Sequence, residues 1–123
     1  MTAPITTKEK LRVLVCGGRD YADATRVNTV LSGINPDVII HGGASGADTL
    51  AGTWAWRNGK GCRVVFPDWQ LHGRAAGPLR NQKMLDEHAP DMVVAFPGGK
   101  GTADMVHRAK AKGVPVIELE ELP

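Results

Sequence analysis

Two stretches of the chain combine glycines with polar side chains in patterns that suit the binding of an anion. Residues 41–48 read His-Gly-Gly-Ala-Ser-Gly-Ala-Asp, and residues 96–104 read Phe-Pro-Gly-Gly-Lys-Gly-Thr-Ala-Asp. Each stretch leads into a segment of helical character, so backbone N–H groups and the positive end of a helix dipole would face a ligand there. Glycines as dense as those at 98–101 cost backbone entropy that a plain connection would not require. Both stretches predict phosphate-binding loops.

Two further stretches supply charge and hydrogen-bonding groups. In Gly17-Gly18-Arg19-Asp20-Tyr21, the glycines permit a tight turn, and Arg19 could reach an anion. Residues 77–84 contain Arg80, which could pair bidentately with a phosphate or carboxylate, and Asn81, which could bind a sugar or base. An ordinary turn and a solvated arginine are the alternatives for these two stretches.

Some of these residues also have purely structural interpretations. Asp48 would stand in the first turn of a helix, where the dipole favours an acid whatever the function, so helix capping and ligand contact are equally open for it. His41 ends an apolar run and is interpreted as a structural histidine. The chain carries neither the P-loop ending nor the dinucleotide fingerprint, which argues against ordinary kinases, GTPases and dehydrogenases.

The elements that must position these loops alternate along the chain. Short runs rich in Val, Ile and Leu predict strands covered on both faces, at Arg12–Cys16, Asp37–His41, Arg63–Phe66, Met92–Phe96 and Pro115–Leu119. Helical segments lie between them, at Asp23–Ser32, Gly46–Asn58, Pro78–His88 and Gly101–Lys112. This alternation predicts an α/β class, a single Rossmann-like three-layer domain with a mostly parallel five-stranded sheet and helices on both faces.

Such a sheet binds ligands outside the carboxyl ends of its strands, so the glycine-rich stretches should gather at one edge. The long connection Pro67–Gly77 has no strong periodicity. It carries Trp69, the aromatic residue best placed to stack on a base.

Length and composition bound the remaining possibilities. With 123 residues the chain has room for one domain, expected at 11–123 after a flexible lead-in at 1–10. The net charge of +2 argues against nucleic acid recognised mainly through its phosphates. Cys16 and Cys62 are expected to be buried thiols in a cytoplasmic protein, since no membrane span, signal peptide or metal-ligand cluster is present in the sequence.

Taken together, the four glycine-containing motifs resemble the YspA-like, YpsA-related branch of the SLOG superfamily over about residues 11–119. The resemblance implies a Rossmann-like fold and a nucleotide-derived ligand, with no other cofactor required. Its ligand-binding residues would be Gly17, Gly18, Arg19, Asp20, Gly42, Gly43, Ser45, Gly46, Asp48, Trp69, Arg80, Asn81, Pro97, Gly98, Gly99, Lys100, Gly101 and Thr102.

The chain departs from the enzymes of this superfamily at one position. The related Lonely Guy phosphoribohydrolases carry Pro-Gly-Gly-x-Gly-Thr-x-x-Glu and an Arg-x-x-x-Met pattern. Here Arg80 and Met84 fit the second pattern, but Met105 stands where the glutamate belongs. Asp104, one residue earlier, would point about 100° away around a helix. Asp104 could still take the place of the missing glutamate, so Arg80 and Asp104 are the candidate catalytic pair.

Three functional interpretations follow. The first is a sensor or binding module for a nucleotide or phosphoribosyl-type ligand. The second is a nucleotide N-glycosidase in which Asp104, Asp20 or Asp48 takes the acidic role. The third, a DNA-associated protein such as the related DprA, is disfavoured by the near-neutral charge and sparse aromatics. The resemblance and the tryptophans at 54 and 56, of which one is expected in the core and the other at an interface, also predict a homo-oligomer.

Overall fold

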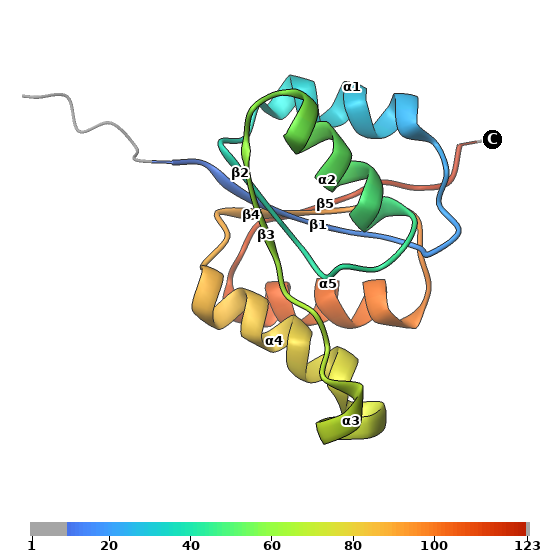
Figure 1. Cartoon of the computed structure of the whole chain (residues 1–123), viewed down its shortest axis with the longest axis vertical. Coiled ribbons are helices and arrows are strands. Elements are labelled where there is room, and N and C mark those ends of the chain that lie inside the picture. The colour runs from blue at the N-terminus through green and yellow to red at the C-terminus, as the bar shows by residue number, and fades with distance from the viewer. Residues whose placement is uncertain (1–9, 123) are drawn as a thin grey trace, which may run out of the picture.

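Five parallel strands form the centre of the molecule (Figure 1). They stand in the order β3-β2-β1-β4-β5, and their bounds are Arg12–Cys16 (β1), Val38–His41 (β2), Gly61–Val64 (β3), Met92–Ala95 (β4) and Val116–Glu118 (β5). This computed structural model describes residues 10–122, so the lead-in predicted at residues 1–10 lies almost wholly outside the described residues. The predicted Rossmann-like α/β class is confirmed, and the sheet is parallel throughout.

Helices cover both faces of the sheet, because alternate residues of each central strand point to opposite faces. On one face, α1 (Ala24–Ile34) and α2 (Ala47–Arg57) pack on a cluster that includes Val13, Val15 and Ile39. On the other face, α4 (Ala76–His88) and α5 (Lys100–Lys112) pack on Leu14, Ile40 and Val93. The apolar runs of the central strands thus serve two cores. No helix within residues 10–122 is long and apolar enough to cross a membrane.

The third strand lies two residues earlier than predicted. Its register is set by β2, whose residues Val38–His41 pair one to one with Gly61–Val64. Because β3 is at the edge of the sheet, all four of its residues are exposed. The sequence prediction of a strand buried on both faces at Arg63–Phe66 was wrong for this reason, and the expectation that Cys62 is buried was wrong with it.

The connection Pro67–Gly77 contains more regular structure than its weak periodicity indicated. The side chain of Asp68 accepts a hydrogen bond from the N–H of Leu71 at 3.0 Å and caps the short helix α3 (Trp69–His72). A 3₁₀ turn, η1 (Gly73–Ala75), follows, and α4 begins directly after it. Pro78 is therefore the third residue of α4 rather than its first.

Three loops meet where the strand order reverses, at the carboxyl ends of β1 and β4. The N–H of Gly18 donates to the carbonyl of Pro97 at 2.8 Å, and the N–H of Ala47 donates to the carbonyl of Gly18 at 3.2 Å. Gly46, which has a φ of +75°, leaves room for this contact, since a Cβ there would overlap the Gly18 carbonyl oxygen. The loop after β1 is thereby joined to the loops after β2 and β4.

We expect Gly46→Ala to lower the free energy of unfolding by about 3–5 kcal/mol, since it combines an unfavourable φ with a clash against backbone. Urea denaturation measures this change. Gly33→Ala is the matched control, because a Cβ at Gly33 in α1 would meet nothing within 4 Å. The control should raise stability by about 0.5–1 kcal/mol. Equal effects of the two substitutions would contradict the role given to Gly46.

Candidate functional site

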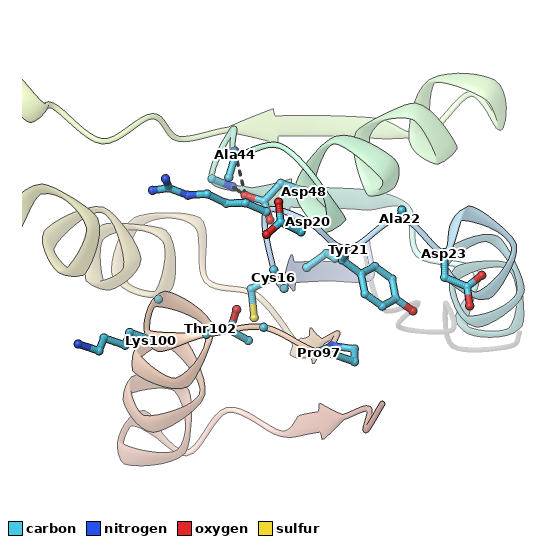
Figure 2. Close-up of a pocket in the computed structure, with 18 of the residues that line it drawn as sticks. Cys16, Asp20, Tyr21, Ala22, Asp23, Ala44, Asp48, Pro97, Lys100 and Thr102 are labelled. Carbon is cyan, nitrogen blue, oxygen red and sulfur yellow. Dashed lines mark hydrogen bonds between the residues drawn. The ribbon is translucent and has the colours of Figure 1, made fainter. Parts of the chain in front are cut away.

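A cavity of about 880 Å³ opens at the carboxyl ends of β1, β2 and β4 (Figure 2). The loops after these three strands and the N-terminal half of α4 form its walls. Fourteen of the predicted ligand-binding residues line it: Gly17, Gly18, Arg19, Asp20, Gly42, Asp48, Arg80, Asn81, Pro97, Gly98, Gly99, Lys100, Gly101 and Thr102. The sequence motifs therefore converge on one concave site, as the fold class requires.

Three predicted residues of the glycine stretch at 41–48 support the loop after β2 without lining the cavity. Ser45 donates its hydroxyl hydrogen to the carbonyl of Arg19 at 3.2 Å. Gly43 faces the ring of Phe66, and Gly46 packs against the loop after β1. These residues position the loop.

Trp69 also lies outside the cavity. It begins α3, is 52% exposed, and its ring lies beside Gly77 at the start of α4. A base held in the cavity would therefore not stack on Trp69 in this arrangement.

Asp48 explains why the loop after β2 holds its shape. Its Oδ2 atom accepts hydrogen bonds from the N–H groups of Gly42 at 3.0 Å and Ala44 at 3.2 Å, and the residue is 5% exposed. Figure 2 shows the carboxylate beneath Ala44. The chain's own carboxylate thus occupies the loop amides that were predicted to receive a phosphate.

The electrostatics of this part of the site couple Asp48 to Arg80. Burial raises the pKa of Asp48, while the two loop N–H groups and the Arg80 guanidinium act in the opposite direction. Burial lowers the pKa of Arg80, and the Asp48 carboxylate opposes that shift. Burial and the charge of Arg80 also lower the pKa of His41, whose Nδ1 accepts a hydrogen bond from the N–H of Gly43 at 3.0 Å. His41 is neutral and structural in this setting.

Arg80 and Asn81 form a bridge across the cavity floor. Arg80 donates through Nη1 to the carbonyl of Gly42 and through Nε to Oδ1 of Asn81 at 3.0 Å. The amide nitrogen of Asn81 donates to Oδ2 of Asp104 at 3.0 Å and to the carbonyl of Gly101 at 3.3 Å. Asn81 is 5% exposed, with both ends of its amide occupied. It ties α4 to the start of α5.

Asp104, the candidate catalytic acid, accepts a hydrogen bond from Asn81 in this bridge. Asp104 receives a second hydrogen bond from Nε of Arg108, at 2.8 Å, and does not line the cavity. Met105, at the position of the enzymes' glutamate, is 0% exposed and belongs to the core between the sheet and α4 and α5. The structure thus places neither side chain where it would face a ligand in the cavity.

The N-termini of α2 and α5 both follow a glycine N-cap, Gly46 and Gly99, and neither has a side-chain cap. They differ in charge, because Asp48 lies in the first turn of α2 whereas the first turn of α5 contains no acidic residue. Added Cβ atoms at Gly99 and Gly101 would meet nothing within 4 Å, whereas those at Gly17, Gly18 and Gly98 would press on neighbouring atoms. The first group of glycines borders open cavity space, and the second permits close packing of the loops.

Sequence reasoning missed part of the cavity wall. Cys16, Tyr21, Asp23, Arg26 and Met84 line it, as do Glu121 and Leu122. Nη1 of Arg26 donates to the carbonyl of Glu120 at 2.7 Å and holds the segment after β5 beside the cavity. Cys16 and Tyr21 could have been predicted from their position at or just after the end of a strand. No local sequence signal predicts that residues 121–122 lie at this edge of the sheet. No group of three or more His, Cys, Asp or Glu side chains in the described part of the chain is arranged to hold a metal ion.

Fold and site together define a Rossmann-like α/β protein with a ligand-sized cavity at its topological switch point. Residues 11–72 match the model of the YAcAr family, described as the YspA, cpYpsA-related SLOG family. The chain belongs to this family.

The chain is also similar to two known proteins, one in sequence and one in fold. The Gene 61 protein of Mycobacterium phage D29 is 38% identical over 127 residues, covering 91% of this chain and 98% of that protein. The X-ray structure of DNA processing protein A (DprA) from Streptococcus pneumoniae superimposes with a TM-score of 0.51 at 21% identity. That likeness concerns the fold, and it covers 87% of this chain but 58% of DprA, so this chain spans little more than half of the DprA structure.

The two substitutions Asp48→Ala and Asp48→Asn should separate hydrogen bonding from charge. Asp48→Ala leaves the buried N–H of Gly42 and the partly buried N–H of Ala44 without an acceptor and should cost about 2–4 kcal/mol of stability. Asp48→Asn keeps an acceptor oxygen and should cost much less. Because the folded state raises the pKa of Asp48, wild type loses stability relative to Asp48→Asn as the pH rises from about 4 towards 7. Urea denaturation at several pH values tests both statements, and an opposite pH trend would contradict the assigned shift.

The two cysteines should differ sharply in reactivity. Burial, with a smaller contribution from Asp48, raises the pKa of the Cys16 thiol to about 12, whereas Cys62 is exposed on β3. Iodoacetamide at about pH 8 should therefore add one carbamidomethyl group to the native protein and a second after denaturation, because the thiolate is the reactive form. Mass spectrometry with Cys62→Ser as the control reads the result. Rapid labelling of Cys16 in the native protein would contradict this environment.

Proposed function

We propose that the cavity binds a nucleotide or phosphoribosyl-type ligand and that the protein acts as a binding or sensing module. The observation that carries the proposal is the uncapped N-terminus of α5, which opens into the cavity beside Gly99 and Gly101. The cavity volume of about 880 Å³ lies within the ordinary range for small-molecule sites. Membership of the SLOG family agrees with a nucleotide-related role.

The phosphate would lie on the loop after β4 rather than on the loop after β2. The amides of the loop after β2 already bind the Asp48 carboxylate, whose charge would repel a second anion. At α5, no side chain caps the first turn, and Gly99, Lys100, Gly101 and Thr102 all line the cavity. A helix N-terminus with free N–H groups favours a phosphate.

The rest of the ligand would extend toward the loop after β1. Asp20 lines the cavity, is exposed, and has no hydrogen-bond partner within residues 10–122. An ionised carboxylate accepts hydrogen bonds, so Asp20 could bind the hydroxyl groups of a ribose. Arg19, on the same loop, would add positive charge beside the phosphate.

Turnover of the ligand is the second candidate function, and Asp20 favours this function as well. With Met105 in the core and Asp104 bound to Asn81 and Arg108, neither is poised to act on an N-glycosidic bond. Asp20 and Glu121 are exposed carboxylates of the cavity wall that make no side-chain hydrogen bond within residues 10–122, and Asp20, on the loop after β1, would take the acidic role. Binding is nevertheless the better-supported proposal, because neither Met105, at the position of the enzymes' glutamate, nor the neighbouring Asp104 lines the cavity.

Gly101→Ala tests the phosphate position without disturbing the fold. The new methyl group would meet no protein atom and should leave stability equal or raise it by up to about 1 kcal/mol, since alanine favours a helix. In the cavity the same methyl group would occupy ligand space, so the affinity for AMP or ADP-ribose should fall at least tenfold. Isothermal titration calorimetry measures the affinity, and Gly33→Ala serves as the control outside the cavity.

Chromatography of the ligand after prolonged incubation distinguishes the two candidate functions. Intact nucleotide supports a sensor. Released base that disappears in Asp20→Asn would replace the sensor by a hydrolase. Absence of binding to any of AMP, ADP-ribose, NAD and ribose 5-phosphate would refute the proposed site.

A further inference from the structure

The side of the molecule around β3 carries most of the large hydrophobic side chains that remain exposed. In the described part of the chain eight such side chains are exposed, and six of them come from α2 to α4. We call this surface the β3 flank. Its apolar members are Trp56, Val64, Phe66, Trp69, Leu71 and Leu79, its basic members are Arg57, Arg63, Arg74 and Lys83, and its acidic member is Asp68. In Figure 1 it runs from α2 along β3 to α3 and the start of α4.

Aromatic rings stand out from this surface. Trp56 is 82% exposed and Phe66 is 70% exposed, and with Val64 they border a hollow of about 380 Å³ between α2 and β3. Trp69 follows three residues after Phe66 and is 52% exposed. Of the two tryptophans of α2, Trp54 is buried in the core, as the sequence predicted for one of them. Exposed aromatic faces of this kind can stack on unpaired bases.

Positive charge is concentrated in the segment of the chain that carries these rings. Six of the 15 basic residues and one of the 13 acidic residues lie between positions 56 and 83, so this segment carries +5 while the whole chain carries +2. The side chains of Arg57, Arg63, Arg74 and Lys83 are exposed, and none has an ion-pair or hydrogen-bond partner within residues 10–122. The near-neutral total used in the sequence analysis conceals this uneven distribution.

The charge decides between two possible occupants of the β3 flank. A second copy of the chain, paired edge to edge through β3, would bring two sets of unpaired cations together, which like-charge repulsion disfavours. A polyanion complements them. Because the rings need unpaired bases, we propose that the β3 flank binds single-stranded nucleic acid, with Trp56 and Phe66 stacking on bases and the four cations contacting phosphates.

This surface is separate from the proposed nucleotide site. Arg80 is the basic residue of the segment that lines the large cavity, whereas the β3 flank residues do not line it. Binding of a strand on the flank and of a small ligand in the cavity should therefore be independent.

Fluorescence anisotropy of the full chain with labelled oligothymidine and oligouridine of about 20 nucleotides tests the proposal, the two probes distinguishing DNA from RNA. Four phosphate contacts predict a slope of about −2.8 for log affinity against log salt, which is about a 50-fold loss between 50 and 200 mM salt. A duplex of equal length should bind at least tenfold more weakly. No saturable binding of either single strand at low salt would overturn the proposal.

Variants on the flank separate stacking from charge. Trp56→Ala and Phe66→Ala should each weaken binding at least fivefold with an unchanged salt slope. The double variant Arg63→Gln and Arg74→Gln should weaken binding and reduce the slope to about −1.4. Lys110→Gln is the matched charge control, since Lys110 pairs with Glu118 on the opposite edge strand, and it should change affinity less than twofold.

The remaining outcomes also bear on the proposal. Binding that the flank variants leave unchanged, or a dimer that Trp56→Ala dissociates and that binds no oligonucleotide, would overturn it. Gly101→Ala should bind the oligonucleotide as wild type does. Loss of oligonucleotide binding in that variant would place the oligonucleotide in the cavity and overturn the proposal for the β3 flank. Failure of this proposal is therefore distinguishable from failure of the nucleotide proposal.

Discussion

The architecture of the site depends on the contact between the backbone of Gly18 and its two neighbouring loops. Gly18 donates to Pro97 and accepts from Ala47, so one residue joins the three loops that enclose the cavity. Such an approach of backbone to backbone leaves no space for side chains at Gly17, Gly18, Gly46 or Gly98. Much of the glycine content of the motifs is thus explained by packing between loops.

The remaining glycines and the charges divide the cavity into two chemically different halves. On the side of β2, Asp48 fills the loop amides and offsets the charge of Arg80. On the side of α5, Gly99 and Gly101 leave the helix N-terminus open. The loops after β2 and β4 look alike in sequence, but a carboxylate of the chain occupies the amides of the first, whereas the second leaves the start of a helix uncapped. The distinction lies in one acidic side chain, Asp48.

The sequence was sufficient for the fold and for most of the cavity lining, because both follow from local patterns. Continuous Val, Ile and Leu runs identify central strands such as β1 and β4, and glycine motifs at strand ends must meet at one edge of a parallel sheet. β3 was misplaced because an edge strand takes its register from its neighbour and shows no buried pattern. Trp69 was placed in the site by its loop, but Asp68 caps a short helix that holds its ring beside Gly77. The hydrogen bonds that hold Asp104 and Asn81 join α4 to α5, and no local sequence pattern predicts such contacts.

The bond from Arg26 to the carbonyl of Glu120 has a practical consequence for handling the protein. It holds residues 121 and 122 in the cavity wall, next to the loop after β1. A tag attached to this segment would begin next to residues 121 and 122 and would compete with a ligand for the same space. Ligand screens with material tagged there would measure the tag as well as the site.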